Sequence, residues 1–266
     1  MLKTRILTGL ALAVVVLGAV FGLATPLSAL VFGVFWILGA SEWARIAGLG
    51  TVGLAVYALI LLGFIALVLG RGIAPAVGDA VLWLAMGAWL VSFVLVLRYP
   101  RPLARPPILV MGLIVLFGAW LAYYRVHGGS ADGPALILVG LAIVWSADIG
   151  AFIVGRTLGR TWLAPRVSPK KTWEGVGGGL VFAALIGGIA ARLLGLPVGL
   201  MLLTAAAMAL ISVVGDLGIS MLKRHAGLKD SGVLLPGHGG ILDRFDGVTA
   251  ALPFYALALQ FAHVLD

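Results

Sequence analysis

Uninterrupted apolar stretches recur along the whole chain, and they limit its fold more than any other feature. Each is roughly 20 residues long, enough for a helix to cross a hydrocarbon core of ~30 Å. In lipid, only helices and closed barrels satisfy their own backbone hydrogen bonds. The stretches are continuous rather than alternating every second residue, which excludes a barrel. The sequence therefore predicts an all-α, polytopic integral membrane protein.

Nine such segments are predicted, with prolines mainly at the breaks between them. The second is the shortest, and no soluble extra domain, repeat or low-complexity tract interrupts the series. We expect a single membrane domain over 1–266, with N-terminal hydrophobic helices at 1–133 and a second half at 134–266. The segments are 6–23, 27–41, 52–70, 77–97, 107–124, 134–154, 175–194, 198–222 and 247–265.

The charge distribution predicts an orientation. Only 11% of residues are charged, against about 25% in soluble domains. The net charge of +8 does not indicate a nucleic-acid partner, because the basic residues lie in short loops between apolar segments. Placing the N-terminus in the cytoplasm and alternating puts fifteen Lys and Arg residues inside and three outside, namely Arg71, Arg125 and Arg192. This agrees with the positive-inside rule, and it places the C-terminus outside.

The first segment has an alternative interpretation. It follows Lys3 and Arg5, so it also fits a cleaved signal peptide. Further spans follow it directly, which favours a first membrane helix instead.

Asp148 and Asp216 lie inside predicted apolar segments, near their inner ends. An ionisable side chain at that depth is costly and is by default a functional hypothesis. The alternative for each is a structural role, as a member of an interhelical ion pair or as a polar residue at a helix end. For Asp216, the presence of a second carboxylate, Asp243, just before the next apolar segment favours a functional role.

Residues 220–246, called here the polar segment, hold three carboxylates (Asp230, Asp243 and Asp246) among basic residues and His238. The chain has no cysteine, which excludes disulfides, thiolate chemistry and a Cys-ligated metal. Mg²⁺ prefers oxygen ligands and keeps several waters, so one or two carboxylates plus phosphates suffice to bind it. Asp216 and Asp243 are predicted to hold such an ion. Phosphate charge would be met by Lys223, Arg224 and Lys229, and by backbone N–H groups at Gly237, His238, Gly239 and Gly240.

A second basic patch, Ser168 to Gly175, precedes the seventh segment and contains Lys170 and Lys171. It fits either a positive-inside anchor or a phosphate site, with its Ser and Thr capping the following helix. The remaining polar residues are assigned structural roles: Glu42, Asp79 and Asp132 as helix-end residues, and His127 and His263 as surface or interfacial residues.

The polar segment resembles the signature of phosphatidate cytidylyltransferases (CDP-diacylglycerol synthases) of the bacterial type. The matching residues are Ser220, Lys223-Arg224, Lys229-Asp230, His238-Gly239-Gly240 and Asp243-Arg244-x-Asp246. Upstream, Asp148, Gly155 and the patch 168–175 resemble a second block of that family. The resemblance covers about 145 to 250, so the half 134–266 is expected to be the catalytic one.

The resemblance implies that CTP and phosphatidic acid react to CDP-diacylglycerol and pyrophosphate, in the bacterial inner membrane with the site facing the cytoplasm. It implies a metal centre of Mg²⁺, with a monovalent cation such as K⁺ beside it, and a homodimer. The expected metal ligands are Asp216 and Asp243. The expected catalytic set is Lys223, Arg224, Lys229, Asp230, His238, Arg244 and Asp246. The expected substrate-binding set is Ser168, Lys170, Lys171, Asp148, Gly239 and Gly240.

Three other functions would draw on the same residues. A CDP-alcohol phosphotransferase needs Arg at the position of Ala251 and further aspartates downstream, and only Asp266 follows, so that class is excluded. A CTP-dependent kinase of a membrane lipid alcohol remains an alternative. An ion-coupled transporter using Asp148 and Asp216 is a third, although the polar residues gather at one face rather than the midplane.

Overall fold

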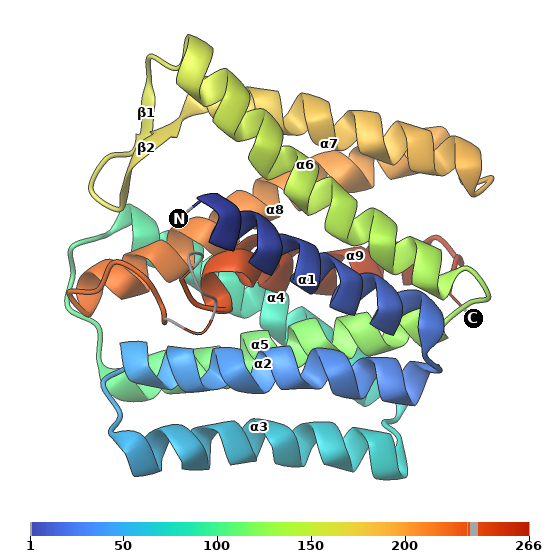
Figure 1. Ribbon diagram of the computed structural model, residues 1–266, viewed down its shortest axis with the longest axis horizontal. Coiled ribbons are helices and arrows are strands. Elements are labelled where there is room, and N and C mark those ends of the chain that lie inside the picture. The colour runs from blue at the N-terminus through green and yellow to red at the C-terminus, as the bar shows by residue number, and fades with distance from the viewer. Residues whose placement is uncertain (1, 233, 235–238, 266) are drawn as a thin grey trace.

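The computed structural model describes residues 2–232, 234 and 239–265, with side chains from residue 8 onward. His238 lies outside the described residues. Nine helices run through the described part of the chain (Figure 1). They are α1 (Leu2–Gly22), α2 (Thr25–Ile46), α3 (Thr51–Arg71), α4 (Pro75–Leu97), α5 (Arg105–Gly128), α6 (Gly133–Leu158), α7 (Trp173–Leu193), α8 (Val198–His225) and α9 (Leu242–Phe261).

The predicted segments correspond to these helices one by one, including the second, which is a 22-residue helix. Prolines open four of the helices, at the first or second helical position of α2, α4, α5 and α6. Proline fits there because its missing N–H would have no partner in the first turn. Pro253 is the exception, because it lies inside α9.

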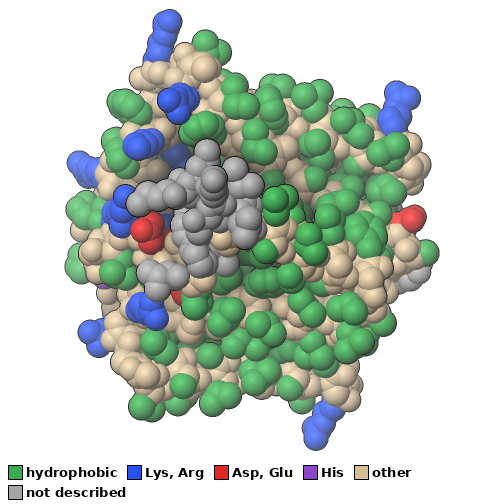
Figure 2. Space-filling view, in the orientation of Figure 1, with side chains coloured by type: hydrophobic (Ala, Val, Ile, Leu, Met, Phe, Trp, Pro, Cys, Tyr) green, Lys and Arg blue, Asp and Glu red, His purple; other side chains and the backbone are tan. Residues whose placement is uncertain are grey.

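The chain is a polytopic membrane protein. In the part of the chain that the structure describes, seven helices, α2 to α8, are long and apolar enough to cross a bilayer. Large apolar side chains cover much of the face shown in Figure 2, and exposed ones such as Val14, Leu90 and Leu203 lie on different helices. Lipid is the solvent that accommodates such a surface.

Helix α9 is the central element of the bundle. It packs against α2, α4, α5, α6 and α8, and most of its residues are buried. Trp89 Nε1 on α4 donates to Thr249 O at 3.2 Å, and Tyr255 Oη donates to Leu136 O on α6 at 3.1 Å. These contacts explain why its sequence is less lipophilic than the others: α9 is surrounded by protein.

A short hairpin between α6 and α7 departs from the all-helical expectation. Strands β1 (Trp162–Ala164) and β2 (Ser168–Thr172) pair antiparallel, with Trp162 opposite Thr172. Glu174 fixes the hairpin to α7, because its carboxylate accepts the backbone N–H groups of Arg160 at 3.1 Å and Thr161 at 3.2 Å. Thr172 caps α7, as predicted, by accepting Gly175 N at 3.1 Å.

The two ends of the bundle differ in polarity. The hairpin, the first turn of α1, the α2–α3 connection and the end of α8 lie at one end, on the left in Figure 1, and most of the basic side chains in Figure 2 gather there. At the other end Arg125 forms an ion pair with Asp79, whose other oxygen accepts Gln260 Nε2 at 3.3 Å.

His127 was predicted to lie at a surface or membrane interface, and this was wrong. His127 is buried, with Nε2 at 2.9 Å from Val20 O and Nδ1 at 3.0 Å from Thr25 Oγ1. It links α5 to the α1–α2 corner rather than lying at a surface.

Candidate functional site

Glycines on α7 bring this helix into backbone contact with α6. A Cβ on Gly178 would lie 2.8 Å from Gly150 O, and one on Gly179 would lie 2.9 Å from Ala147 O. Only a residue without a side chain allows this approach. The close contact sets Asp148, on the same stretch of α6, beside the residues that lead into α7.

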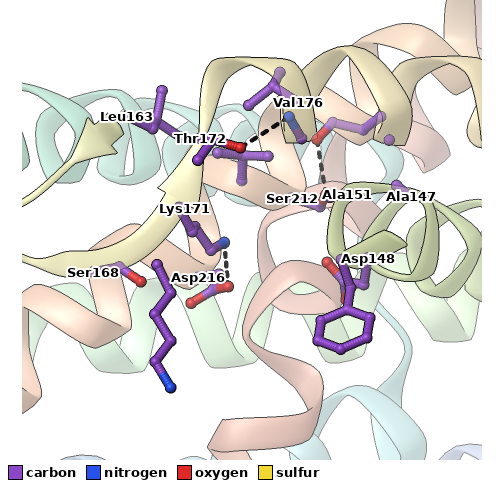
Figure 3. Close-up of a pocket in the computed structure, with 16 residues that line it drawn as sticks. Ala147, Asp148, Ala151, Leu163, Ser168, Lys171, Thr172, Val176, Ser212 and Asp216 are labelled. Carbon is purple, nitrogen blue, oxygen red and sulfur yellow. Dashed lines mark hydrogen bonds and ion pairs between the residues drawn. The ribbon is translucent and has the colours of Figure 1, made fainter. Parts of the chain in front are cut away.

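A cavity of about 320 Å³ opens between α6, β2, α7 and α8. Its polar lining includes the predicted substrate residues Ser168, Lys170, Lys171 and Asp148, together with Asp216. Figure 3 shows Lys171 reaching from β2 to form an ion pair with Asp216 on α8, while Asp148 lies across the cavity on α6. Residues far apart in sequence thus meet at one cavity.

Lys171 is the cation of an acidic cluster that we define as Asp148, Asp216 and Asp246. Burial lowers the pKa of the Lys171 ammonium. Asp216 opposes this through its charge and its hydrogen bond, and the charges of Asp246 and Asp148 add to that effect. The net result is a pKa above the ordinary lysine value, so Lys171 stays protonated at neutral pH.

Asp246 joins the cluster because α8 and α9 touch backbone to backbone. A Cβ on Gly215 would clash with the carbonyl oxygen of Asp246. One carboxylate oxygen of Asp246 accepts Gly247 N at 2.8 Å. On α8, next to Gly215, Asp216 accepts Ser220 Oγ at 3.1 Å.

A second cavity, of about 380 Å³, lies on the other side of Asp148, between α1, α6 and α9. Asp243, Arg244 and Asp246 line it together with apolar residues of α1 such as Leu12. Asp148 lines both cavities, so a ligand in either one would meet the same carboxylate.

Asp243 is held by three donors. Lys223 Nζ lies 2.7 Å from Oδ1, and the backbone N–H groups of Ser231 and Gly240 donate to Oδ2 at 2.9 and 3.0 Å. Both side chains of the ion pair are about nine-tenths buried, with 10% of Lys223 and 9% of Asp243 exposed. Gly239 lies against the same carboxylate and has φ +87°, a conformation that favours glycine.

Five of the predicted residues lie at the surface of the protein. Arg224, Lys229, Asp230, Arg244 and Lys170 are exposed. Arg224 Nη1 donates to Leu228 O at 3.3 Å, and Asp230 lies beside Gly239. Arg224 and Lys229 therefore present positive charge at the surface, whereas Lys223 is buried in its ion pair with Asp243.

Glu42 was assigned to a helix end, and this was wrong. It is 1% exposed, on α2, and its carboxylate accepts the N–H groups of Ile241 at 3.0 Å and Leu242 at 2.9 Å, and Ser231 Oγ at 2.8 Å. The available sequence signal was an acidic residue at the edge of an apolar segment. The predicted end of that segment, at 41, was one residue too early to include it.

The two predicted metal ligands lie at different cavities, Asp216 at the first and Asp243 at the second. Asp216 and Asp243 each bind an ammonium group, so each carboxylate is arranged to receive positive charge. Among the described residues, no three Asp, Glu or His side chains converge into a complete metal site. An ion held here needs further oxygens from water and phosphate, which is how Mg²⁺ is commonly bound.

The chain matches the model of the cytidylyltransferase family over residues 3–262. It is 43% identical to the phosphatidate cytidylyltransferase of Pseudomonas aeruginosa, with 97% of each chain covered. It is 37% identical to that of Haemophilus influenzae, covering 96% of this chain and 98% of the relative, and 32% identical to that of Bacillus subtilis, covering 97% and 98%. The chain therefore belongs to the cytidylyltransferase family.

Proposed function

We propose that the protein is a phosphatidate cytidylyltransferase, which converts CTP and phosphatidic acid to CDP-diacylglycerol and pyrophosphate for phospholipid biosynthesis. The near-full-length similarity to proteins of that name carries the proposal. At a cavity in a membrane protein, the acidic cluster offers carboxylates for a cation, and Lys171 offers an ammonium group for the phosphates of a lipid and a nucleotide.

The proposed reaction is an in-line substitution at the α-phosphorus of CTP. An oxygen of the lipid phosphate forms the new P–O bond, and the bond between the α-phosphorus and the bridging oxygen breaks, so that pyrophosphate leaves with the electron pair. A phosphate monoester is already ionised near neutral pH, so no general base is needed. Catalysis then rests on positioning and charge stabilisation.

The described residues that are predicted to bind phosphate divide into two groups by their surroundings. Ser168, Lys170 and Lys171 at the first cavity would take the lipid phosphate or the triphosphate. Arg224, Lys229 and Arg244 would meet phosphate charge from the surface, and Lys223 would act through Asp243. Asp148, Gly239 and Gly240 belong to the substrate-binding set, Asp230 and Asp246 would organise their neighbours, and His238 stays a prediction outside the described residues.

The cytidylyltransferase family generally depends on a divalent cation. We assign Mg²⁺ to Asp216 and Asp243, with K⁺ as a candidate second cation. When bound, Mg²⁺ neutralises charge on the phosphates and on the departing pyrophosphate. Asp216 and Asp243 would be its protein ligands, with Lys171 beside Asp216 and Lys223 beside Asp243.

We further propose a bacterial inner-membrane location with the N-terminus and the active site facing the cytoplasm. The support is the fifteen-to-three distribution of basic residues. Nine spans, a single membrane domain divided near 133/134 and a homodimer remain predictions.

The test is purified protein in detergent with CTP, phosphatidic acid and Mg²⁺. We expect pyrophosphate release and a CDP-lipid product by mass spectrometry, with loss of both when any component is omitted or Mg²⁺ is chelated. A phosphorylated lipid alcohol as the product would support the kinase alternative. Ion movement in proteoliposomes without CTP consumption would support the transporter. Repeating the assay with K⁺ removed tests the second cation.

A further inference from the structure

Glu42 connects α2 to the polar segment across the interior of the protein. Its two carboxylate oxygens accept three hydrogen bonds of 2.8–3.0 Å, from Ser231 Oγ, Ile241 N and Leu242 N. Each donor belongs to residues 220–246 and is about 190–200 positions away in sequence. An acidic side chain that is 1% exposed needs such donors, because an unsatisfied buried carboxylate is strongly disfavoured.

The contact completes the start of α9. The first N–H groups of a helix lack partners inside the helix, and the residue preceding α9, Ile241, provides no side-chain cap. Glu42 supplies the missing acceptor from another helix, and its negative charge interacts favourably with the positive N-terminal end of the α9 dipole. The position of the first turn of α9 is therefore set by α2.

That first turn carries Asp243, and a shared residue links the two carboxylates. The Ser231 hydroxyl donates a hydrogen bond to Glu42, and the Ser231 backbone N–H donates one to Oδ2 of Asp243 at 2.9 Å. Gly240 donates its N–H to Oδ2 of Asp243 at 3.0 Å and also packs against Glu42. Glu42 thus fixes both the helix that bears Asp243 and the loop that donates to it.

Two glycines of the polar segment pack closely against the Glu42 carboxylate. A Cβ on Gly232 would clash with Oε1 of Glu42, and a Cβ on Gly240 would clash with Oε2. Both glycines therefore permit their own backbone to lie directly against the carboxylate.

We propose that Glu42 is a positioning residue for the reaction: it holds Asp243, together with its donors Ser231 and Gly240, in the geometry that receives the metal and nucleotide. The proposal rests on the proposed function for its kinetic consequence. Residues that orient a metal ligand typically affect metal affinity or activity by about 10- to 100-fold when they are changed.

The test compares Glu42→Gln and Glu42→Asp with wild type in detergent. In Glu42→Gln an NH₂ group replaces one acceptor oxygen and opposes a backbone N–H. We expect kcat to fall by about 10- to 100-fold and the Mg²⁺ concentration for half-maximal rate to rise by about 10-fold. Glu42→Asp keeps both oxygens and is expected to recover part of kcat.

Hydrogen–deuterium exchange of the metal-free protein provides a readout that does not depend on turnover. We expect faster exchange in peptides covering 239–250 in Glu42→Gln, because the acceptor for the Ile241 or Leu242 amide is lost. If wild type forms no CDP-lipid, the proposed function fails, and the exchange result still decides whether Glu42 holds the start of α9.

The matched control is Ser28→Ala. Ser28 is buried on the same helix, and its Oγ lies 2.6 Å from Tyr123 Oη, away from the polar segment. This variant loses a buried hydrogen bond, yet we expect kcat, Mg²⁺ dependence and exchange at 239–250 to match wild type. Kinetics and exchange in Glu42→Gln that equal those of Ser28→Ala, per folded molecule, would overturn the proposal.

Discussion

Lys223 Nζ lies 2.7 Å from Oδ1 of Asp243, and about nine-tenths of each side chain is buried. A pair in this setting is sensitive to the loss of one member, because the remaining charge stays buried without compensation. Substitution of either residue therefore changes the stability of the protein as well as the charge that the site presents to a ligand.

Asp243→Asn is expected to reduce turnover by about 100-fold or more, because a bound metal supplies several kcal/mol of transition-state stabilisation. It is also expected to lower the free energy of unfolding by about 3–5 kcal/mol, since Lys223 loses its partner. Pyrophosphate release and thermal unfolding in detergent measure the two effects. Adding Lys223→Met should restore part of the stability without restoring activity. Near-normal turnover in Asp243→Asn would rule out Asp243 as a metal ligand.

Lys171→Met is expected to affect kcat, whereas Lys170→Met is expected to affect KM, although the two residues are adjacent. Lys171 neutralises the acidic cluster, so its loss is expected to lower kcat by about 100-fold, a typical effect of removing a charge-stabilising donor. Lys170 is exposed, and screened surface charges contribute at most about 1 kcal/mol, so its loss should raise a substrate KM by up to about fivefold with kcat retained. Steady-state kinetics in CTP and in phosphatidic acid separate the outcomes; equal effects on kcat would contradict the distinction.

The stability that Lys171 provides should depend on pH at the alkaline end only. Its folded-state pKa is raised above the unfolded value of about 10.4. The contribution is therefore fully present below that value and is lost as pH rises through the folded-state pKa. The difference in melting temperature between wild type and Lys171→Met is expected to be constant from about pH 7 to 9.5 and to shrink above about pH 10.4. A difference that already vanishes near pH 8 would show that the ammonium is not held as described.

Gly215→Ala is expected to separate α8 from α9, because its Cβ would clash with the Asp246 carbonyl oxygen. Overpacking of this kind costs about 1–3 kcal/mol, and activity should fall with it because Asp216 and Asp246 move apart. Melting temperature and pyrophosphate release measure the two effects.

Gly63→Ala is the control for this substitution. Gly63 lies within α3, and a methyl group placed on it would have nothing within 4 Å. Alanine favours a helix over glycine by about 0.5–1 kcal/mol, so this variant should keep or gain stability and retain activity. Equal stability of the two variants would contradict close backbone packing at Gly215.

The helices could be predicted from the sequence because each lipid-crossing segment carries its own signal. An apolar run long enough to span the bilayer, bounded by proline or charge, specifies a helix without information from the rest of the chain. The residues of the first cavity were also identifiable, since Asp148 and Asp216 are costly in an apolar segment and Lys170 and Lys171 form a basic patch just before one. What the sequence lacked was the pairing: Lys171 with Asp216, and Lys223 with Asp243.

Two features escaped prediction for physical reasons. The hairpin at 162–172 is too short, and too rich in basic residues and proline, to show a strand pattern. Glu42 was assigned to the end of a segment, whereas α2 continues for four residues beyond it, to Ile46. Its partners are backbone N–H groups and a serine about 190–200 residues away, and backbone donors leave no trace in a sequence.

The separation between Glu42 and its partners has a consequence for biosynthesis. Ile241 and Leu242 follow Glu42 by 199 and 200 residues, so the helices from α3 to α8 leave the ribosome before these amides do. Until these amides have been synthesised, the Glu42 carboxylate on α2 lacks its final backbone hydrogen-bond donors. Helix α9 thus supplies the donors that compensate the buried charge on α2, and this part of the site forms only after α9 has been synthesised.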